Sequence, residues 1–362
     1  MKNKTLIILP DLRIGGAEKN SVLIANELYL QGVDVVFVLK NDLNSYSFML
    51  NPKIKIISLN VNRLRNMFIP LIKVLKDEKP ELIIASMWPL TTITLISLII
   101  SKVRSKIYFI EHVPLFVSRK YETKSSKFIM KLLINLTYGF AQKIICVSSG
   151  IKNELLNETF VNKKKFEVIH NPIAPATNNI SINESYWKNL NSKKILSVGS
   201  LKYAKNHQLL IKSIKFLSEK INCELIIIGE GPLYNDLKYL IATLNLDEKV
   251  QILNYRNDIS SFYKSADVFA LTSRWEGFGN VLIEAMSYGT PVVSTDCPYG
   301  PGEIIIDDSL GYLVSGFDPE SFSQAILTIL GKKNNKEELI SYSKKFNVSK
   351  QVNKYLKVLN VK

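Results

Sequence analysis

The sequence predicts an α/β protein built from two doubly wound domains, each with a parallel sheet between layers of helices. Three observations predict this class. The chain has 362 residues, which is more than one hydrophobic core usually supports. Short apolar segments alternate with helical ones, as parallel βαβ units require. This alternation stops at a polar segment, residues 171–193, and then restarts.

The N-terminal alternation opens on a short apolar strand and a glycine-containing loop, which leads into a helix closed by Gly32. Residues 89–101 form the longest apolar run, which falls short of the ~20 residues of a membrane span, so we expect a buried helix there. Five segments of this half are expected to be strands: 5–10, 33–40, 81–86, 106–112 and 143–148.

The polar segment is rich in Asn and contains two prolines, which is typical of a linker. We expect an N-terminal domain at 1–172, a linker at 173–193, a C-terminal domain at 194–340, and helices at 341–362 that pack back toward the N-terminal domain. Ligands of open parallel sheets bind beyond the carboxyl ends of the strands, so the cleft between the two domains is the predicted site. The strands expected after the linker are 194–200, 223–231, 250–254, 267–273 and 291–295.

Cysteine usage and the N-terminus favour a cytoplasmic protein. The three cysteines are isolated and form no C-x-x-C pair, which argues against a disulfide framework and against a zinc cluster. The basic start is followed by an apolar run of only four residues, 6–9, and no small-residue cleavage site follows, so we expect no signal peptide.

The net charge of +15 is concentrated in the N-terminal half, where residues 1–170 hold 25 Lys and Arg against 13 Asp and Glu. Such a surface suits nucleic acid, anionic lipid headgroups or anionic small molecules. In the segment 119–138, Lys124, Lys127 and Lys131 follow helical spacing beside an apolar stripe. This pattern is typical of ordinary surface helices and also of helices that lie on an anionic membrane.

Residues 274–293, RWEGFGNVLIEAMSYGTPVV, are expected to form a turn and a helix after a strand. Asn280 is the expected N-cap and Gly289 the expected end of this helix. Glu276 then lies just before the helix, and Glu284 lies one turn inside it. A helix N-terminus suits a phosphate, and carboxylates beside it accept hydrogen bonds from sugar hydroxyls, which is the layout of a nucleotide-sugar. The alternative is a structural turn with exposed glutamates.

The two glutamates, with seven residues between them in EGFGNVLIEAMSYGTPVV, closely resemble the signature of the retaining glycosyltransferases of family 4. That family has the GT-B fold, in which two Rossmann-like domains face each other across an interdomain cleft. The motifs that carry the resemblance are, in chain order, GGAEK (15–19), EH (111–112), VIHNPI (168–173), SVGSLKYAKNHQLLIKSI (197–214), LIIIGEGPLYNDL (225–237), DVFALTSRWEGFG (267–279) and STDCPYGPGEII (294–305). The last of these is similar to segments of enzymes that extend lipid-linked or cell-surface glycans.

The resemblance implies a role for each matched residue. Glu276 would hold hydroxyls of the donor sugar near the reacting centre, and Glu284 would hold the ribose hydroxyls. Lys205 would stabilise the departing diphosphate, and His112 would line the cleft near the transferred sugar, so Glu276, His112 and Lys205 are the expected catalytic residues. The other expected donor-binding residues are Gly15, Gly16, Ser200, Arg256, Gly277, Phe278, Gly279, Asn280 and Val281.

The sequence departs from the family at Ser200, where an arginine is usual, and Lys202 is the candidate to replace that phosphate contact. No residue stands out as a covalent nucleophile, so the expected mechanism is front-face substitution in which the leaving phosphate oxygen takes the proton of the acceptor. The adjacent Asp307 and Asp308 do not form a convincing metal-binding motif, so we expect no metal and no other cofactor.

The predicted function is the retaining transfer of a hexosyl or N-acetylhexosaminyl group from a nucleotide-sugar, expected to be a UDP-sugar. The acceptor is expected to be a lipid-linked or oligosaccharide glycan in the synthesis of capsule, lipopolysaccharide O-antigen or a related polysaccharide. The chain is expected to be peripheral on the inner face of the cytoplasmic membrane, with Lys124, Lys127 and Lys131 on the face toward the membrane and acceptor. One alternative is a nucleotide-sugar epimerase or hydrolase of the same fold. A nucleic-acid-binding protein is a more distant alternative, since only the charge suggests it and no such motif is present.

Overall fold

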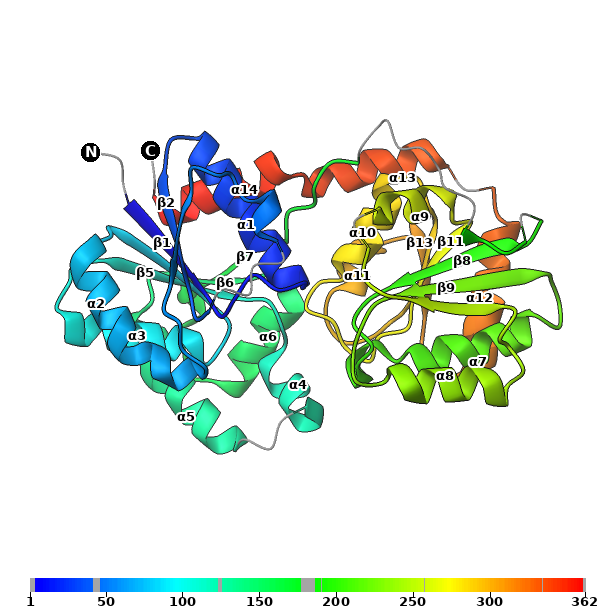
Figure 1. Ribbon diagram of the computed structural model, residues 1–362, viewed down its shortest axis with the longest axis horizontal. Helices are drawn as coiled ribbons and strands as arrows, with labels where there is room; N and C mark the ends of the chain where they lie inside the picture. Colours follow the sequence, from blue (N-terminus) through cyan, green and yellow to red (C-terminus); the bar gives the residue numbers. More distant parts are fainter. Residues whose placement is uncertain are drawn as a thin grey trace. The chain divides into compact units, whose positions relative to one another are not determined.

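The computed structural model describes residues 4–41, 46–122, 126–176, 186–189, 191–256, 258–333 and 335–360. The chain forms two compact units, the first from Met1–Ala174 with Phe346–Lys362 and the second from Pro175–Lys345. Each unit holds one sheet of parallel strands with helices on both faces (Figure 1). The predicted α/β class with two doubly wound domains is therefore confirmed.

The sheet of the first unit has seven strands in the order β3-β2-β1-β4-β5-β6-β7. Its central strands are apolar on both faces, and Ile7 of β1 lies in register with Phe37 of β2 and Ile84 of β4. The edge strands β3 and β7 are short and only partly buried, which explains why apolar periodicity does not predict them. The bounds are β1 Lys4–Leu9, β2 Asp34–Leu39, β3 Lys55–Ser58, β4 Leu82–Ser86, β5 Lys106–Glu111, β6 Ile144–Cys146 and β7 Phe166–Val168.

The helices of the first unit lie on opposite faces of its sheet because the connections run in opposite directions from the middle strands. The chain moves from β1 to β2 through α1 but from β4 to β5 through α3, and right-handed crossovers place these two helices on opposite faces. Helix α14 packs on α1, whereas α2 and α5 pack on α3 (Figure 1). The bounds are α1 Gly16–Leu30, α2 Phe68–Glu78, α3 Leu90–Ser101, α4 Leu115–Glu122, α5 Lys127–Thr137, α6 Ser149–Glu158 and α14 Val348–Leu359.

Helix α3 corrects the prediction of a buried helix at 89–101. Its sheet-facing residues are buried, but Ile96, Ile99 and Ile100 are 38%, 58% and 50% exposed. The helix covers the sheet with one side only, so the other apolar side stays in solvent. None of the described helices is both long enough and apolar enough to cross a bilayer.

The sheet of the second unit has six strands in the order β10-β9-β8-β11-β12-β13. Five of them are the predicted strands, and the edge strand β13 is not predicted by the sequence pattern because only its two end residues are buried. The bounds are β8 Lys193–Val198, β9 Cys223–Ile228, β10 Val250–Leu253, β11 Val268–Leu271, β12 Val292–Thr295 and β13 Gly311–Val314.

The helices of the second unit also lie on opposite faces of their sheet, because the connections run in opposite directions from its middle strands. Helices α7, α8 and α12 form one group of packed helices, and α9, α10 and α13 form the other (Figure 1). The bounds are α7 His207–Leu217, α8 Tyr234–Thr243, α9 Ile259–Ser265, α10 Asn280–Ser287, α11 Pro301–Ile304, α12 Pro319–Gly331 and α13 Lys336–Ser343.

The C-terminal segment is divided between the two units. Helix α13 packs on α10 of the second unit, whereas α14 returns to the first unit and packs on α1. The Tyr108 hydroxyl of β5 donates a hydrogen bond to the Leu359 carbonyl at the end of α14, over 3.2 Å. The last helix is thus part of the first unit, and the division falls at residue 345.

Residues 186–189, at the end of the predicted linker, pack on the second unit. The Trp187 side chain is only 3% exposed, and its indole N–H donates to Ser265 Oγ at 3.1 Å. The Glu224 carboxylate accepts hydrogen bonds from the backbone N–H groups of Lys188 and Asn189. Composition does not predict this packing, because a single tryptophan anchors a segment that is otherwise polar.

Candidate active site

The signature residues of the second unit lie where its strand order changes direction. Strands β8 and β11 are neighbours, but the chain leaves β8 toward one edge of the sheet and β11 toward the other. Ligands of open parallel sheets bind beyond the carboxyl ends of the strands at such a point. Lys205 follows β8 and Glu276 follows β11, so the fold brings them to the same place although 71 positions separate them.

Lys205 and Glu276 form an ion pair. The Lys205 Nζ atom lies 2.5 Å from Glu276 Oε1, and the Ser273 hydroxyl donates to the same oxygen at 2.6 Å. The side chains of Lys205 and Glu276 are 21% and 9% exposed, so the pair is largely shielded from solvent. Both bonds go to Oε1; among the described residues, no hydrogen bond to Oε2 is formed. That oxygen is therefore available to accept a hydrogen bond from a ligand hydroxyl.

The backbone around Lys205 is fixed by the segment that follows β11. The Thr272 hydroxyl donates to the Lys205 carbonyl at 3.2 Å, and the Arg274 N–H donates to the Ala204 carbonyl at 2.7 Å. The Lys205 stem lies along Gly199, where an added Cβ would be 3.4 Å from Lys205 Cδ and Cε. These contacts hold the lysine in one place before any ligand binds.

Glycines bring the loops at this edge of the sheet close together. An added Cβ at Gly229, after β9, would lie 1.9 Å from the carbonyl oxygen of Gly199, after β8. At Gly300, which has φ +91°, a Cβ would lie 2.1 Å from the Phe278 carbonyl oxygen. Only glycine allows such approaches of backbone to backbone. Phe278 itself is 2% exposed, so its ring is part of the core.

Helix α10 starts one residue differently from the prediction. The N-cap is Gly279, with φ +98°, and Asn280 is the first helical residue. The left-handed backbone at position 279 suits glycine, which explains why Asn280 does not take the cap position. Gly289 has φ +76° after the end of α10, and its left-handed conformation is as predicted.

Glu284 is held by a tyrosine from the neighbouring helix. The Tyr263 hydroxyl of α9 donates to Glu284 Oε2 at 2.9 Å. Tyr263 stacks on Tyr288, with ring centroids 5.9 Å apart and planes inclined by 7°. The carboxylate on the second turn of α10 thus has a fixed orientation.

Two family models match the chain, one for each half. A model described as Glycosyltransferase Family 4 matches residues 14–177, and one described as Glycosyl transferases group 1 matches residues 179–346. The amylovoran biosynthesis glycosyltransferase AmsD of Erwinia amylovora is 32% identical over 70% of this chain and 68% of its own length. The chain belongs to the family 4 glycosyltransferases.

Two further relatives of this family 4 chain carry more specific names. A Campylobacter jejuni 4-alpha-N-acetylgalactosaminyltransferase, whose named substrate is a diphospho-undecaprenol-linked disaccharide, is 38% identical over 56% of the chain. The chain spans about half the length of that relative, 54%. An Escherichia coli alpha-1,3-galactosyltransferase, named for UDP-Gal and GlcNAc-diphosphoundecaprenol, is 29% identical over 66% of the chain and 65% of its own length.

Solved structures agree with the fold. Anabaena HepE in complex with UDP-glucose matches with a TM-score of 0.83 at 20% identity, over 99% of each chain. A sucrose-phosphate synthase from Thermosynechococcus elongatus matches with a TM-score of 0.84 at 16% identity, over 99% of this chain and 98% of the other. These matches confirm the predicted GT-B class of two Rossmann-like domains.

Three other residues expected at the donor site of this family 4 chain are Arg256, Ser200 and Lys202. Arg256 donates to Asp258 Oδ1 at 2.8 Å and to the Tyr186 hydroxyl, and its guanidinium carbon lies 4.4 Å from the Tyr186 ring centroid. The bond to Asp258 raises the pKa of Arg256 and lowers that of the aspartate. Ser200 and Lys202 are both exposed.

The predicted residues of the first unit lie at the carboxyl edge of its sheet. Gly15 is the N-cap of α1 in an extended conformation, and Gly16 begins that helix after β1. His112 follows β5 and is 5% exposed. Burial lowers the pKa of His112 to about 4, against a smaller opposite effect of Asn171, so the imidazole is neutral near pH 7.

The lysines predicted on the membrane face are only partly described. Lys127 and Lys131 of α5 both pair with Glu158, at 2.7 and 3.5 Å. Lys124 lies outside the described residues. The charge of the two described lysines is thus partly balanced within the first unit.

Sequence reasoning missed several residues that support the site. Ser273 and Tyr263 orient the two glutamates. Ser273 lies within the motif of residues 267–279, but the resemblance assigns no role to it, and Tyr263 lies outside the matched motifs. Arg274, beside the signature, lies over the Tyr203 ring at 4.4 Å and donates to Asn206 Oδ1 at 3.0 Å. Cys297 is buried near the ion pair; burial, with a smaller effect of Glu276, raises the pKa of its thiol to about 12. Only their place in the motif of residues 267–279 could have indicated Ser273 and Arg274.

Acidic and metal-ligating side chains do not gather in the described part of the chain. Within those ranges, no three His, Cys, Asp or Glu side chains lie together as a metal-binding group. Asp307 accepts hydrogen bonds from the Ser309 N–H and hydroxyl, at 2.9 and 2.7 Å, and thus closes a local turn.

Proposed function

We propose that this chain transfers a sugar from a UDP-sugar to a lipid-linked glycan acceptor, with retention of anomeric configuration, in the synthesis of a cell-surface polysaccharide. The observation that carries the proposal is the shielded Lys205–Glu276 pair at the switch point of the second sheet, with Ser273 on the same carboxylate oxygen. Family membership supports the reaction class. The names of the Campylobacter and Escherichia relatives support a diphospho-undecaprenol-linked acceptor.

The donor would bind across the start of α10. Glu276 would accept hydroxyls of the sugar, and Glu284, oriented by Tyr263, would accept those of the ribose. The N–H groups at the start of α10 face outward from the helix and favour the diphosphate between the two sugars. The complex of Anabaena HepE with UDP-glucose supports a UDP-linked donor.

Lys205 would change partners during the reaction. Its ammonium is paired with Glu276 before the donor binds, and the diphosphate would offer it a second anion. As the bond between the anomeric carbon and the phosphate oxygen breaks, negative charge grows on the leaving UDP. A positioned lysine stabilises that charge, which lowers the barrier without proton transfer by the lysine.

The acceptor would attack on the face that the leaving group departs from. The acceptor oxygen forms the new bond to the anomeric carbon, and its proton passes to the leaving phosphate oxygen, so the charges balance. His112 would line the transferred sugar as a neutral hydrogen-bonding group, since burial lowers its pKa to about 4. We propose that Gly15 and Gly16 allow close approach of the acceptor to the first unit, and that no metal is required.

A lipid-linked acceptor would place the reaction at a membrane. A lipid-diphosphate acceptor stays in the bilayer, so we propose that the chain acts from the cytoplasmic side as a peripheral protein, with the first unit as the acceptor domain and the second as the donor domain. The excess of Lys and Arg in residues 1–170 supports attraction to anionic lipid.

The test is turnover with a panel of UDP-sugars on a short-chain polyprenyl-diphosphate-linked sugar, in the presence and absence of a chelator. Glu276→Gln should lower turnover by at least about 100-fold, because it removes a charge at the reacting centre. The matched control is Glu219→Gln on an exposed carboxylate of the same unit. NMR of the product should show the anomeric configuration of the donor. Donor consumption without acceptor, an inverted product or normal turnover of Glu276→Gln would contradict the proposal.

A further inference from the structure

Helix α5 of the first unit carries an apolar side that is exposed among the described residues of the unit. Its outward residues are Phe128, Ile129, Leu132 and Leu136, which are 74%, 55%, 48% and 59% exposed. Residues 128, 132 and 136 are spaced by four, so they lie above one another along one side of the helix. Large apolar residues on one surface stripe differ from the single exposed ones that any protein shows.

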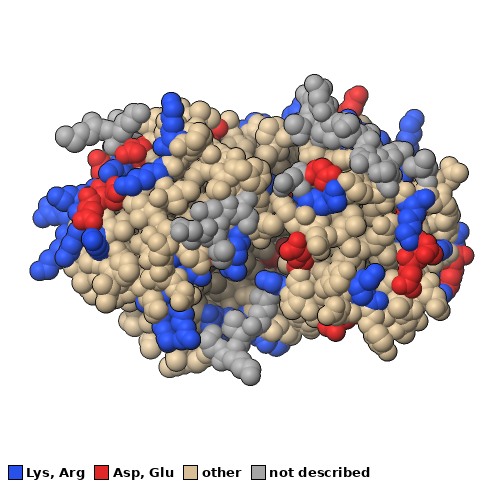
Figure 2. All heavy atoms as spheres, viewed as in Figure 1, with Lys and Arg blue, Asp and Glu red and all other residues tan. Residues whose placement is uncertain are grey.

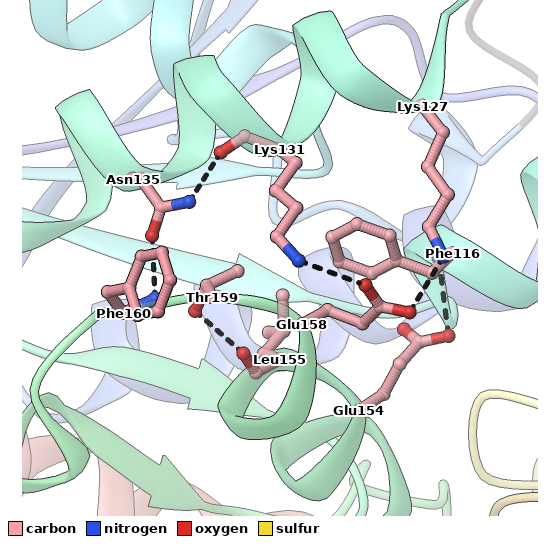
Figure 3. A network of polar contacts seen from close by, with 9 residues as sticks. All are labelled: Phe116, Lys127, Lys131, Asn135, Glu154, Leu155, Glu158, Thr159 and Phe160. Carbon is pink, nitrogen blue, oxygen red and sulfur yellow. Dashed lines mark hydrogen bonds and ion pairs between the residues drawn. The ribbon is translucent and has the colours of Figure 1, made fainter.

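The other two sides of α5 are occupied. Met130, Ile134 and Thr137 are buried, and the Thr137 hydroxyl lies 3.2 Å from that of Thr92 in α3. On the polar side, Lys127 and Lys131 reach Glu158 at the end of α6, as Figure 3 shows.

A third bond fixes the same polar side. Asn135 accepts a hydrogen bond from the Phe160 N–H at 2.6 Å and donates one to the Lys131 carbonyl at 2.8 Å (Figure 3). A rotation of α5 that buried its apolar side would break its bonds to Glu158 and to the Phe160 N–H, and it would expose Met130 and Ile134. The apolar side is therefore held outward by the packing of the unit.

Two exposed phenylalanines lie near the C-terminal end of α5. Phe140, in the turn after α5, is 64% exposed. Phe160, which is bonded through its N–H to Asn135, is 92% exposed. We define the α5 face as Phe128, Ile129, Leu132, Leu136, Phe140 and Phe160.

Lysines lie beside the α5 face. Lys165 Nζ donates to the carbonyl of Ala141, the residue after Phe140, at 2.8 Å. Lys143 Nζ donates to the Lys164 carbonyl at 3.0 Å, which holds the turn of Lys163, Lys164 and Lys165 at the same end.

The charge around the α5 face is positive overall. With Lys127 and Lys131, six lysines stand against two glutamates, Glu158 and Glu167, that pair with three of them. Along the lower edge of the first unit, where Figure 1 places α5, Figure 2 shows uncharged and basic side chains.

We propose that the α5 face enters the interfacial region of a bilayer that contains anionic lipid, with the lysines of residues 143 and 163–165 among the headgroups. Leucine and phenylalanine on one side of a helix, with lysines beside them, are typical of helices that lie in the membrane interface. A protein partner would need acidic groups around an apolar groove, whereas an anionic bilayer supplies both features without further assumptions. This inference deepens the proposed function, on which it rests for the membrane-bound acceptor.

The inference changes which side chains contact the membrane. The sequence predicts contact through Lys124, Lys127 and Lys131. Of these, Lys127 and Lys131 lie on the side of α5 that is bonded to Glu158, and Lys124 lies outside the described residues. The apolar side chains would provide most of the attraction, and the lysines of the adjacent turn would add sensitivity to salt and to lipid charge.

The test is sedimentation of the full chain with vesicles of phosphatidylcholine alone or with phosphatidylglycerol added. The double substitution Leu132→Ser with Leu136→Ser should lower the partition coefficient for anionic vesicles by at least about tenfold. The matched control is Leu30→Ser on α1, which is 71% exposed and lies on the other face of the sheet. A second measurement uses Phe128→Trp, whose fluorescence should shift to shorter wavelength with anionic vesicles, whereas that of Leu30→Trp should not.

The outcomes separate this inference from the proposed function. Equal partitioning of the double variant and the wild type would overturn the inference, as would equal binding to neutral and anionic vesicles. The wild type could instead form a dimer in sedimentation velocity and fail to bind vesicles, while the double variant stays monomeric. That result would overturn the inference and assign the α5 face to contact with a second copy of the chain. The double variant should turn over a water-soluble acceptor as fast as the wild type does. If the wild type itself showed no turnover, that result would contradict only the proposed function.

Discussion

Lys205 and Glu276 are joined by an ion pair of 2.5 Å that connects the loops after β8 and β11. The carboxylate oxygen in this pair is shared with the Ser273 hydroxyl, and the lysine backbone is bonded to Thr272. The two strands that carry these loops are neighbours in the sheet at its switch point. The pair therefore fixes a cation and a carboxylate at the place where a parallel sheet binds its ligand.

Replacing the lysine should weaken the binding of UDP. We expect Lys205→Met to raise the dissociation constant of UDP by about 10- to 100-fold, since a charge-assisted hydrogen bond to a phosphate contributes about 1.5–3 kcal/mol. Isothermal titration calorimetry measures this effect. Lys212→Met, on an exposed lysine of α7, is the control and should leave UDP binding unchanged. Equal UDP affinities of the Lys205 variant and the wild type would show that Lys205 does not contact the phosphates.

Substitution of Tyr263 should affect donor binding more than chemistry. Tyr263→Phe removes the hydroxyl that donates to Glu284 at 2.9 Å but keeps the ring that stacks on Tyr288. A lost hydrogen bond of about 0.5–1.5 kcal/mol predicts a rise of about 2- to 12-fold in KM for the donor, with kcat nearly unchanged. Tyr239→Phe on α8, at a residue that is 76% exposed, is the matched control. A fall in kcat at constant KM would place Tyr263 in the chemical step instead.

The sequence predicts the strands and the signature well because both depend on short stretches of chain. Strands that are buried on both faces, such as β1 and β9, are continuous apolar runs. The edge strands β3, β7 and β13 lack that pattern, and their pairing depends on neighbours elsewhere in the chain.

The partners of the signature residues could not be predicted for a related reason. The contact between Lys205 and Glu276 spans 71 positions and that between Tyr263 and Glu284 spans 21. Such contacts depend on strand order, which local periodicity does not encode. The exposure of the α5 face likewise depends on which side of the helix packs against α3, and helical spacing alone does not determine that side.

The position of Gly229 should be intolerant of any side chain. Gly229→Ala would place a Cβ 1.9 Å from the Gly199 carbonyl oxygen, so the loops after β8 and β9 would have to separate. We expect a loss of about 2–4 kcal/mol in the free energy of unfolding and a reduced affinity for UDP. Gly331→Ala is the control because an added Cβ there meets nothing within 4 Å. Urea unfolding followed by circular dichroism should show the control unchanged within about 0.5 kcal/mol. Equal stability of the two variants would show that the loops are not closely packed.

The buried Glu111, at the end of β5, should make the stability of the first unit depend on pH. Its carboxyl is fully buried and accepts a hydrogen bond from the Tyr138 hydroxyl at 2.5 Å. Burial, opposed in part by this bond, raises the pKa of Glu111 to about 8. The unfolded chain releases the same proton near pH ~4.3.

The folded state thus binds one more proton than the unfolded state between these two values. The protonated Glu111 carboxyl therefore contributes fully to the free energy of unfolding below about pH 4, and this contribution is lost as pH rises through about 8. Glu111→Gln keeps an acceptor for Tyr138 but cannot ionise, so its stability should not fall in this way. From pH 5 to pH 9, the unfolding free energy of the wild type should therefore fall by roughly 2–4 kcal/mol more than that of the variant. Glu81→Gln, on an exposed carboxylate before β4, should follow the wild type across the same range in urea unfolding at pH 5, 7 and 9. Parallel pH profiles for Glu111→Gln and the wild type would mean that Glu111 is already ionised in the folded protein near pH 7.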